Sequence, residues 1–341
     1  MLTIDFDYFL PKELIAQEPL NVRDQSRLLV LNRQALSLEH QNFYSIGEYF
    51  NAGDVLVLNN TKVMPARLLG IKEDTGARVE VLLLRRLTMN YYEVLVKPGK
   101  KVKLGSKLIF GKGELTARVQ DYTPYGGRVL ELFYNGDLEN LLESLGQVPL
   151  PPYIHKELQD RNRYQTVYNK HWGSAAAPTA GLHFTEKLIE QLKSKGVEVV
   201  ELLLHVGLGT FRPVETDIVE EHRMHSEYYR LEQKEAEIIN KVKEQKGRVI
   251  AVGTTTVRVL ETIAGSGGQL EAAEGWSDIF IYPGYRFKLI DNLVTNFHLP
   301  KSTLLMLVSA FAGKEFIMEA YREAIKQRYR FFSFGDAMLI Q

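Results

Sequence analysis

The chain has 341 residues, 45% hydrophobic and 25% charged, and its 42 Lys and Arg balance its 42 Asp and Glu. This composition is ordinary for a globular protein and allows about two domains. Because the sequence contains no cysteine, disulfides, thiolate zinc sites and iron–sulfur clusters are excluded. Acidic residues and the lack of an apolar run near the N-terminus predict a cytoplasmic protein without a signal peptide or membrane span.

The first 61 residues contain two strand-like runs, Arg27–Leu31 and Val55–Leu58, but no complete core. From 62 to 147 the pattern changes to short β-type runs that are separated by glycine and proline turns. Such runs, without a helical period, predict an inserted antiparallel β-barrel domain over 62–147. A short amphipathic helix closes it over Leu138–Leu145. The predicted strands are Ala66–Ile71, Arg78–Leu84, Tyr91–Val96, Lys107–Phe110, Glu114–Gln120 and Arg128–Phe133.

Beyond the barrel, strands and helices alternate. This alternation predicts an α/β main domain, layered or barrel-like, with a substantially parallel sheet. We assign it residues 1–61 and 148–341. Thr185 is a predicted N-cap, and the helix that it begins ends at Gly196. The other predicted helices are Gln233–Gln245, Thr254–Ala264, Thr303–Ala312 and Glu315–Arg328, and the strands are Val197–Leu204, Arg248–Val252, Ile279–Tyr282 and Val294–Phe297.

Five turns rich in Gly, Thr, His, Asn and Arg lie next to these predicted elements. In open α/β sheets, ligands bind at the carboxyl ends of strands, and helix N-termini present free N–H groups to anions. The turns therefore predict an enzyme site for a nucleoside-like ligand, although each alone also fits a packed structural turn. They are Ser174–Thr185, Leu204–Pro213, Val252–Arg258, Thr295–Pro300 and Arg330–Asp336.

Two further stretches are compatible with RNA binding. The stretch Lys97–Lys112 holds six lysines and no acid, and Tyr153–Trp172 interleaves cations with aromatic rings. Aromatic rings stack on splayed bases while cations follow the phosphates, but a solvated face and an amphipathic connector explain the same patterns. The histidines of Glu221–Glu227 lack the HExxH pattern, so no metal site is predicted.

In order, the strings SAAAPTAGLHFT, LHVGLGTFRPV, VGTTTVRVLE, TNFHLPKSTLLMLVSA and RFFSFGDAML closely resemble the S-adenosylmethionine:tRNA ribosyltransferase-isomerase family of queuosine biosynthesis. The stretches LIAQEPLNVRDQSRLLVLNR, GDVLVLNNTKVMPARL and PLPPYI match it too, so the resemblance covers nearly the whole chain. It implies transfer and isomerisation of the ribosyl moiety of S-adenosylmethionine onto 7-aminomethyl-7-deazaguanine at the tRNA wobble position. The implied products are epoxyqueuosine-tRNA, adenine and methionine. The resemblance also implies a monomer, an α/β domain with an inserted barrel, and no cofactor besides the consumed S-adenosylmethionine.

This chemistry suggests roles for residues in the matching turns. His205 or His183 could remove a proton from the carbon beside the sulfonium, and His298 or Asp336 could assist the departure of adenine. Arg212 or Arg258, with the turn Thr254–Thr256, could hold the methionine end. The predicted catalytic residues are His183, His205, His298 and Asp336. The predicted substrate-binding residues are Thr179, Gly207, Gly209, Thr210, Arg212, Thr254, Thr255, Arg258, Asn296, Arg330 and Phe332.

The predicted partners are tRNA with a modified wobble base and S-adenosylmethionine. We considered two alternatives, an S-adenosylmethionine-dependent RNA methyltransferase and a non-catalytic RNA-binding protein. A methyltransferase should carry a glycine-rich loop after its first strand, which this sequence lacks, and polar turns at strand ends argue against a purely binding protein. The predicted tRNA-binding residues are Lys97, Lys100, Lys101, Lys103, Arg163, Tyr164 and Tyr168.

Overall fold

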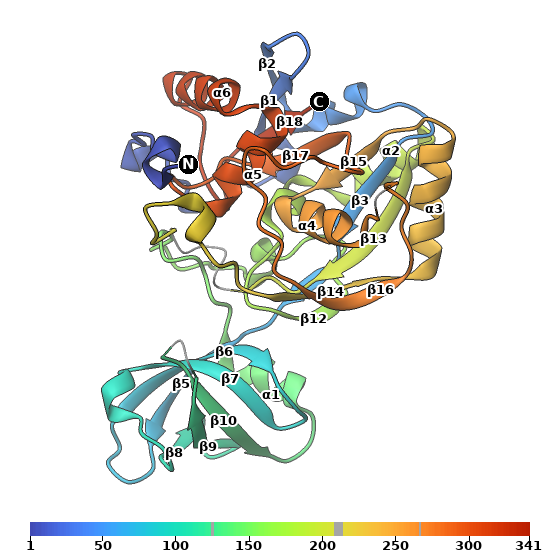
Figure 1. Ribbon diagram of the computed structural model, residues 1–341. Coiled ribbons are helices and arrows are strands. Elements are labelled where there is room, and N and C mark those ends of the chain that lie inside the picture. The colour runs from blue at the N-terminus through green and yellow to red at the C-terminus, as the bar shows by residue number, and fades with distance from the viewer. Residues whose placement is uncertain (124–125, 208–213, 266) are drawn as a thin grey trace. The chain divides into compact units, whose positions relative to one another are not determined.

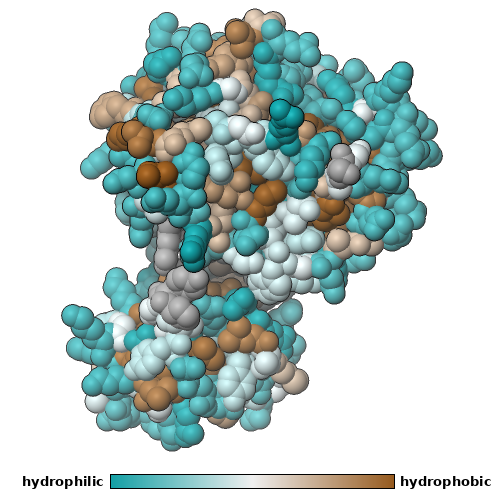
Figure 2. All heavy atoms as spheres, in the orientation of Figure 1, coloured by the Kyte–Doolittle hydropathy of each residue, from teal (hydrophilic) through white to brown (hydrophobic). Residues whose placement is uncertain are grey.

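The computed structural model describes residues 1–123, 126–207, 214–265 and 267–341 (Figure 1). It divides into two compact units. The first comprises Met1–Thr61, Pro151–His171 and Ala177–Gln341, and the second comprises Lys62–Leu150 and Trp172–Ala176. Within the described ranges, no helix combines the length and apolar character needed to cross a membrane. On the face shown in Figure 2, hydrophobic side chains lie in small groups among hydrophilic ones.

The first unit is built on a nine-stranded mixed sheet of order β16-β14-β13-β3-β15-β17-β18-β1-β2. The neighbours β13, β3, β15 and β17 are parallel to one another, whereas β18 is antiparallel to β17 and parallel to β1. The predicted α/β class with a substantially parallel sheet is confirmed. The strands are β1 (Arg27–Asn32), β2 (Ser37–Asn42), β3 (Val55–Asn59), β13 (Glu198–Leu204), β14 (Glu227–Leu231), β15 (Val249–Val252), β16 (Ala273–Ser277), β17 (Asn292–Asn296) and β18 (Ala337–Ile340).

Helices accompany this sheet, and the central strands are buried along their whole length. Every residue of β3, β15, β17 and β18 is buried, as expected where both faces of a sheet are covered. Thr185 caps α2 as predicted, because its Oγ1 accepts the N–H of Leu188 at 3.1 Å. The helices are α2 (Glu186–Ser194), α3 (Gln233–Glu244), α4 (Thr254–Ile263), α5 (Thr303–Ala312) and α6 (Lys314–Lys326).

The second unit is a closed antiparallel barrel, as predicted. Its strands follow the order β5-β6-β7-β10-β9-β8, and β8 pairs back onto β5. Buried residues alternate with less buried ones along β6 and β9, the period of two expected of strands with one face in a core. The strands are β5 (Arg67–Lys72), β6 (Arg78–Arg86), β7 (Tyr91–Lys97), β8 (Lys107–Phe110), β9 (Leu115–Tyr122) and β10 (Arg128–Tyr134), and α1 is Leu138–Leu145. The remaining strands of the described residues are short: β4 (Thr61–Val63), β11 (Gly146–Gln147) and β12 (His171–Ser174).

One predicted strand, Ile279–Tyr282, was wrong. The sheet is instead extended by the preceding segment β16, which pairs with β14. The ring of Phe280 packs against His222 and Tyr282, with centroids 5.3 and 4.9 Å apart. The aromatic residues of Ile279–Tyr282 are typical of a strand, but the segment is held by contacts between rings and not by hydrogen bonds to a neighbouring strand. Among the described residues, no group of His, Asp and Glu that could hold a metal ion is found.

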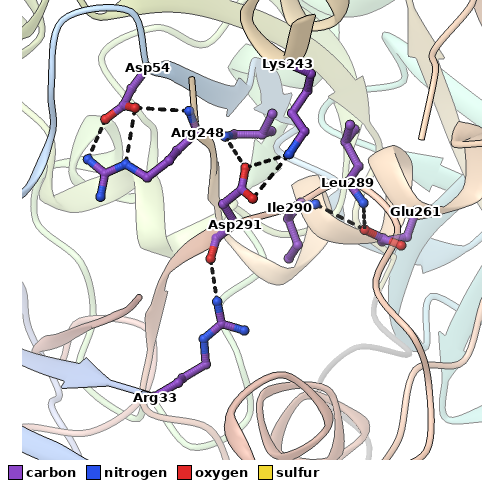
Figure 3. Close-up of polar contacts among 9 residues, drawn as sticks. Arg33, Asp54, Lys243, Arg248, Glu261, Leu289, Ile290 and Asp291 are labelled. Carbon is purple, nitrogen blue, oxygen red and sulfur yellow. Dashed lines mark hydrogen bonds and ion pairs between the residues drawn. The ribbon is translucent and has the colours of Figure 1, made fainter. Parts of the chain in front are cut away.

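The carboxylates of buried Asp54 and partly exposed Asp291 hold the amino ends of the central strands (Figure 3). Asp54, just before β3, accepts the backbone N–H of Arg248 at 3.0 Å and its Nη2 at 2.6 Å. It also accepts the N–H of Asn51 at 2.7 Å. Asp291, just before β17, accepts the N–H of Val249 at 2.7 Å. These contacts fix the starts of β3, β15 and β17, so this end of the sheet is built for stability.

Replacing Asp54 by asparagine is expected to lower the free energy of unfolding by about 2 kcal/mol at neutral pH, because Arg248 loses its charged acceptor. Burial raises the pKa of Asp54, but the hydrogen bonds from Arg248 and Asn51 outweigh it and bring the pKa below its ordinary value of 3.8. A lowered folded-state pKa stabilises the fold above the unfolded-state pKa, and this contribution is lost as the pH falls through the folded-state pKa.

Urea titrations of the wild type and the Asp54→Asn variant test this expectation. The difference in the free energy of unfolding between the two proteins should have its full size at neutral pH and shrink below about pH 4. Asp74→Asn is the control, since the Asp74 side chain is 66% exposed and pairs with Lys72. A difference for Asp54→Asn that is the same at neutral and acid pH would contradict the argument.

Candidate functional site

The carboxyl ends of the four parallel strands lie at one edge of the sheet, and a pocket opens there. The turns that follow β15 and β17 form part of its wall. The start of β18 lies at the same edge, because Ala337 pairs with Asn296 at the end of β17. Turns that are far apart in the sequence therefore converge. Six predicted site residues line this pocket: Thr179, Thr254, Thr255, Asn296, His298 and Phe332.

Helix α4 begins at the pocket. Gly253 precedes it with a φ of 88°, a left-handed conformation that glycine adopts without strain. Thr254 and Thr255, in the first turn, line the pocket, and the first N–H groups of a helix have no partner within the helix. This helix start can therefore hold a carboxylate or a phosphate.

Asn59, which our sequence reasoning did not single out, ties three of these elements together. It is fully buried at the end of β3. Its Nδ2 donates to the Leu204 backbone oxygen at 3.0 Å and to Thr255 Oγ1 at 3.3 Å, and its Oδ1 accepts the Leu204 N–H at 3.1 Å. In the sequence, the only indication of this role is that Asn59 and Asn60 form a polar pair at the end of an apolar strand. Tyr153, Thr295 and Ser333 also line the pocket. Thr295 and Ser333 lie in turns that were predicted to form the site, but none of the three was predicted as a site residue.

His183 lies behind the pocket wall with both ring nitrogens engaged. Its Nδ1 lies 2.7 Å from Ser26 Oγ, and its Nε2 lies 3.1 Å from Asn296 Nδ2. The ring stacks on Phe43 at a centroid distance of 4.9 Å. Burial, helped by two nearby arginine charges, lowers the pKa of His183 to about 3. The imidazole is therefore neutral and has no nitrogen left for a substrate.

His298 lines the pocket and has one ring nitrogen available. Its Nε2 lies 2.9 Å from Thr295 Oγ1, while no described residue hydrogen bonds to its Nδ1. Its backbone N–H donates to the hydroxyl of Tyr321 at 2.8 Å, and its backbone oxygen accepts from the hydroxyl of Tyr8. Burial lowers the pKa of His298 to about 3. The ring is thus neutral at physiological pH, with one N–H and one acceptor nitrogen, and is held from several sides.

His205 follows β13 and is half-buried beside the pocket residue Val206. Its Nδ1 lies 2.9 Å from Thr61 Oγ1, and its ring stacks on Tyr228 at a centroid distance of 5.8 Å. Burial, with smaller contributions from neighbouring positive groups, lowers the pKa of His205 to about 4. Its Nε2 has no partner in the described part of the chain, so His205 could also exchange a proton with a ligand.

Asp336 supports the loop before β18 and does not line the pocket. It is 1% exposed. Its Oδ1 accepts the Arg27 N–H at 2.9 Å, its Oδ2 accepts the Arg330 N–H at 2.8 Å, and the Arg27 guanidinium lies 3.3 Å away. Arg330 itself donates to the backbone oxygen of Glu18. The predicted contact of Asp336 with adenine does not fit this placement, because its carboxylate is already saturated.

Arg258 is 3% exposed and forms a buried ion pair with Glu227. Its Nη2 donates to the backbone oxygen of Ser277 at 3.2 Å, and Arg258 does not line the pocket. Glu227 also accepts the N–H of Gly207 at 2.7 Å. The prediction that Arg258 holds the methionine end therefore does not fit, and Gly207 has a structural bond. The predicted residues Gly209, Thr210 and Arg212 lie outside the described residues.

The residues predicted to bind tRNA divide into two groups. Tyr164 is fully buried and Tyr168 is 9% exposed, so base stacking on either ring does not fit the structure. Arg163 donates to the backbone oxygens of Asn21 and Leu20 at 2.9 and 2.5 Å, which binds two segments together. The mixture of aromatics and cations there reflects packing. By contrast, the other four are exposed on the barrel: Lys97, Lys100, Lys101 and Lys103.

A pocket with polar groups at the strand ends of an α/β sheet is the arrangement of a small-molecule-binding α/β enzyme. Residues 3–340 match the family described as "Queuosine biosynthesis protein". The chain belongs to this family.

Similar proteins carry more specific names. The S-adenosylmethionine:tRNA ribosyltransferase-isomerase of Symbiobacterium thermophilum is 61% identical over 336 residues, which are 98% of each chain. The protein of the same name from Caldanaerobacter subterraneus subsp. tengcongensis is 57% identical, again over 98% of each chain. The crystal structure of S-adenosylmethionine tRNA ribosyltransferase from Thermotoga maritima is 44% identical, with a TM-score of 0.56 over 99% of this chain and 100% of that one.

Proposed function

We propose that this protein is an S-adenosylmethionine:tRNA ribosyltransferase-isomerase. It transfers and isomerises the ribosyl moiety of S-adenosylmethionine onto 7-aminomethyl-7-deazaguanine at the tRNA wobble position, giving epoxyqueuosine-tRNA, adenine and methionine. The observation that carries the proposal is 61% identity, over 98% of both chains, to a relative of that name. S-adenosylmethionine is consumed, and no further cofactor takes part. The protein acts as a monomer in the cytoplasm, where tRNA is found.

The pocket supplies groups that suit this reaction. The start of α4 at Thr254 and Thr255 suits the methionine carboxylate. The sulfonium acidifies the neighbouring carbon. With its hydrogen on Nε2 and donated to Thr295 Oγ1, the neutral His298 ring has an unprotonated Nδ1 that can take a proton there. We assign His298 as the base because it lines the pocket with a free nitrogen, whereas His183 has none. His205 is the alternative base.

Product identification tests the proposal. The protein is incubated with S-adenosylmethionine labelled in its ribosyl carbons and with tRNA carrying the modified wobble base. Release of adenine and methionine, with the label in tRNA, is the expected result, and tRNA with an unmodified guanine at that position is the control. Release of S-adenosylhomocysteine would instead show a methyltransferase, and tRNA binding without any turnover would show a non-catalytic RNA-binding protein.

We place part of the tRNA contact on the exposed barrel lysines. Lys97, Lys100, Lys101 and Lys103 lie close together in the sequence at the end of β7 and in the turn after it. Among the described residues, none of the four forms an ion pair, whereas the nearby Lys107 pairs with Glu73 at 3.1 Å. Unpaired, exposed cations are available to neutralise phosphates.

Replacing these four lysines by glutamine is expected to weaken tRNA binding and to flatten its salt dependence. The log–log slope should fall by up to about 0.7–0.9 for each phosphate that the variant no longer neutralises. Filter binding over a range of salt concentrations measures both effects. The control variant replaces four exposed lysines of the other unit: Lys187, Lys234, Lys241 and Lys246. If the barrel variant binds tRNA with unchanged affinity and salt slope, these lysines do not contact tRNA.

A further inference from the structure

The side-chain amide of Asn296, in the wall of the pocket, is held in one orientation. Its Nδ2 donates to the backbone oxygen of Phe332 and to Nε2 of His183, both at 3.1 Å. A carboxamide nitrogen has two hydrogens, so these two acceptors use both of its donors. The oxygen of the amide is the group that remains.

His183 supports this orientation. Its ring is neutral, and because Nε2 accepts from Asn296, Nδ1 carries the hydrogen and donates to Ser26 Oγ at 2.7 Å. A half-turn of the Asn296 amide would place its oxygen against the Phe332 oxygen, which can only accept, so this contact selects the observed orientation. In that orientation the Nε2 of His183 accepts the second amide hydrogen and holds the amide from the other side.

The Oδ1 of Asn296 is buried and has no hydrogen-bond partner among the described residues. A buried acceptor without a partner is costly to the fold and calls for an explanation. Asn296 is 3% exposed and lines the pocket. A ligand with an N–H group in that pocket would supply the missing donor.

We propose that Asn296 Oδ1 accepts an N–H of an amino-bearing nucleobase in the pocket, and that His183 is the positioning residue that keeps this acceptor in place. The inference rests on the proposed function, whose two substrates both supply such a group. One source is the 6-amino group of the adenine in S-adenosylmethionine. The other is the deazaguanine of the tRNA. In either case the site selects a donor and rejects an acceptor at the same position.

Binding of S-adenosylmethionine and of its 6-deamino analogue, measured by equilibrium dialysis without tRNA, distinguishes the sources. If the adenine is the donor, the wild type should bind S-adenosylmethionine at least about fivefold more tightly than the analogue, and Asn296→Leu should abolish this preference. Asn292→Leu is the matched control. Asn292 is equally buried on the same strand, its Nδ2 also lacks a partner, and it does not line the pocket.

If the tRNA base is the donor, Asn296→Leu should raise the KM for modified tRNA while the affinity for S-adenosylmethionine stays unchanged. No change in either quantity would overturn the inference. Release of adenine and methionine by the wild type is measured first in the same preparation. Its absence would overturn the proposed function, whereas normal wild-type turnover with unaltered binding by Asn296→Leu would overturn only this inference.

The role of His183 has a separate readout. In His183→Phe the amide can rotate, so the preference for the 6-amino ligand over a 6-oxo analogue should shrink, or, if tRNA supplies the donor, the KM for tRNA should rise as in Asn296→Leu. A merely structural role would weaken all ligands equally and would contradict the positioning role. Thermal melting checks that this variant folds. If His183→Phe does not fold, the Asn296→Leu result by itself tests whether Asn296 Oδ1 is the acceptor.

Discussion

Replacing His298 by glutamine is expected to slow adenine release in a single turnover by about 10²- to 10⁴-fold, the range that general base catalysis contributes. The expectation follows from the free Nδ1 of a ring that lines the pocket and is oriented by Thr295. Rapid quenching with modified tRNA and saturating S-adenosylmethionine measures the rate. His40→Gln is the control, since the His40 side chain is 42% exposed and faces Glu323. A slow His205→Gln with a normal His298→Gln would transfer the role to His205.

The pH dependence of the same rate gives a second check. Because burial lowers the pKa of His298 to about 3, the ring is already in its neutral, proton-accepting form at mildly acid pH. The rate should therefore stay level from neutral pH down to about pH 5 and fall only on further acidification. A histidine of ordinary pKa would lose its basic form near pH 6.5. An inflection there would contradict the assignment of His298.

Replacing Arg258 by methionine is expected to lower the free energy of unfolding by about 3–5 kcal/mol, because the buried carboxylate of Glu227 loses the counter-charge of Arg258. The two side chains are 4% and 5% exposed, so water cannot compensate. The backbone at Gly207 should also be held less firmly, because its N–H donates to Glu227 at 2.7 Å. Guanidinium titration followed by circular dichroism measures the change.

The double variant Arg258→Met with Glu227→Gln separates this structural role from substrate binding. It removes both charges and keeps an acceptor for the Gly207 N–H, so it should be more stable than Arg258→Met alone. If Arg258 instead held the carboxylate of methionine, its replacement would raise the KM for S-adenosylmethionine with little loss of stability, and the second substitution would restore nothing. That result would reverse the structural assignment of Arg258.

Much of the fold could be predicted because it depends on local patterns. The period of two in strands such as β6, and the glycine and proline turns between them, are properties of neighbouring residues, so the barrel strands were found close to their true bounds. The helix start at Thr185 is equally local. The edge strand β2, with the polar sequence SLEHQN, was missed because little of it is buried. The segment Ile279–Tyr282 was misassigned because aromatic residues suit strands and ring clusters alike.

Aromatic residues also show why binding surfaces were harder to predict. Tyr168 looks the same in sequence whether it stacks on a base or fills a core. Its burial depends on Gly181, where an added Cβ would lie 2.0 Å from the Tyr168 hydroxyl. That partner is brought into place only by the fold. The exposure of the barrel lysines is easier to predict than the burial of a tyrosine, since charged side chains are rarely buried without a partner.

The sequence by itself determined the fold class, the barrel and the order of polar turns that marks the family. It could not rank the residues within those turns. His183, Asp336 and Arg258 all lie in them. The first two have their polar side-chain atoms engaged by protein partners and Arg258 is held in a buried ion pair, whereas His298 keeps a nitrogen free beside the pocket. Only the tertiary structure decides this, because a group is available to a substrate only when no neighbour has already satisfied its hydrogen bonds and charge.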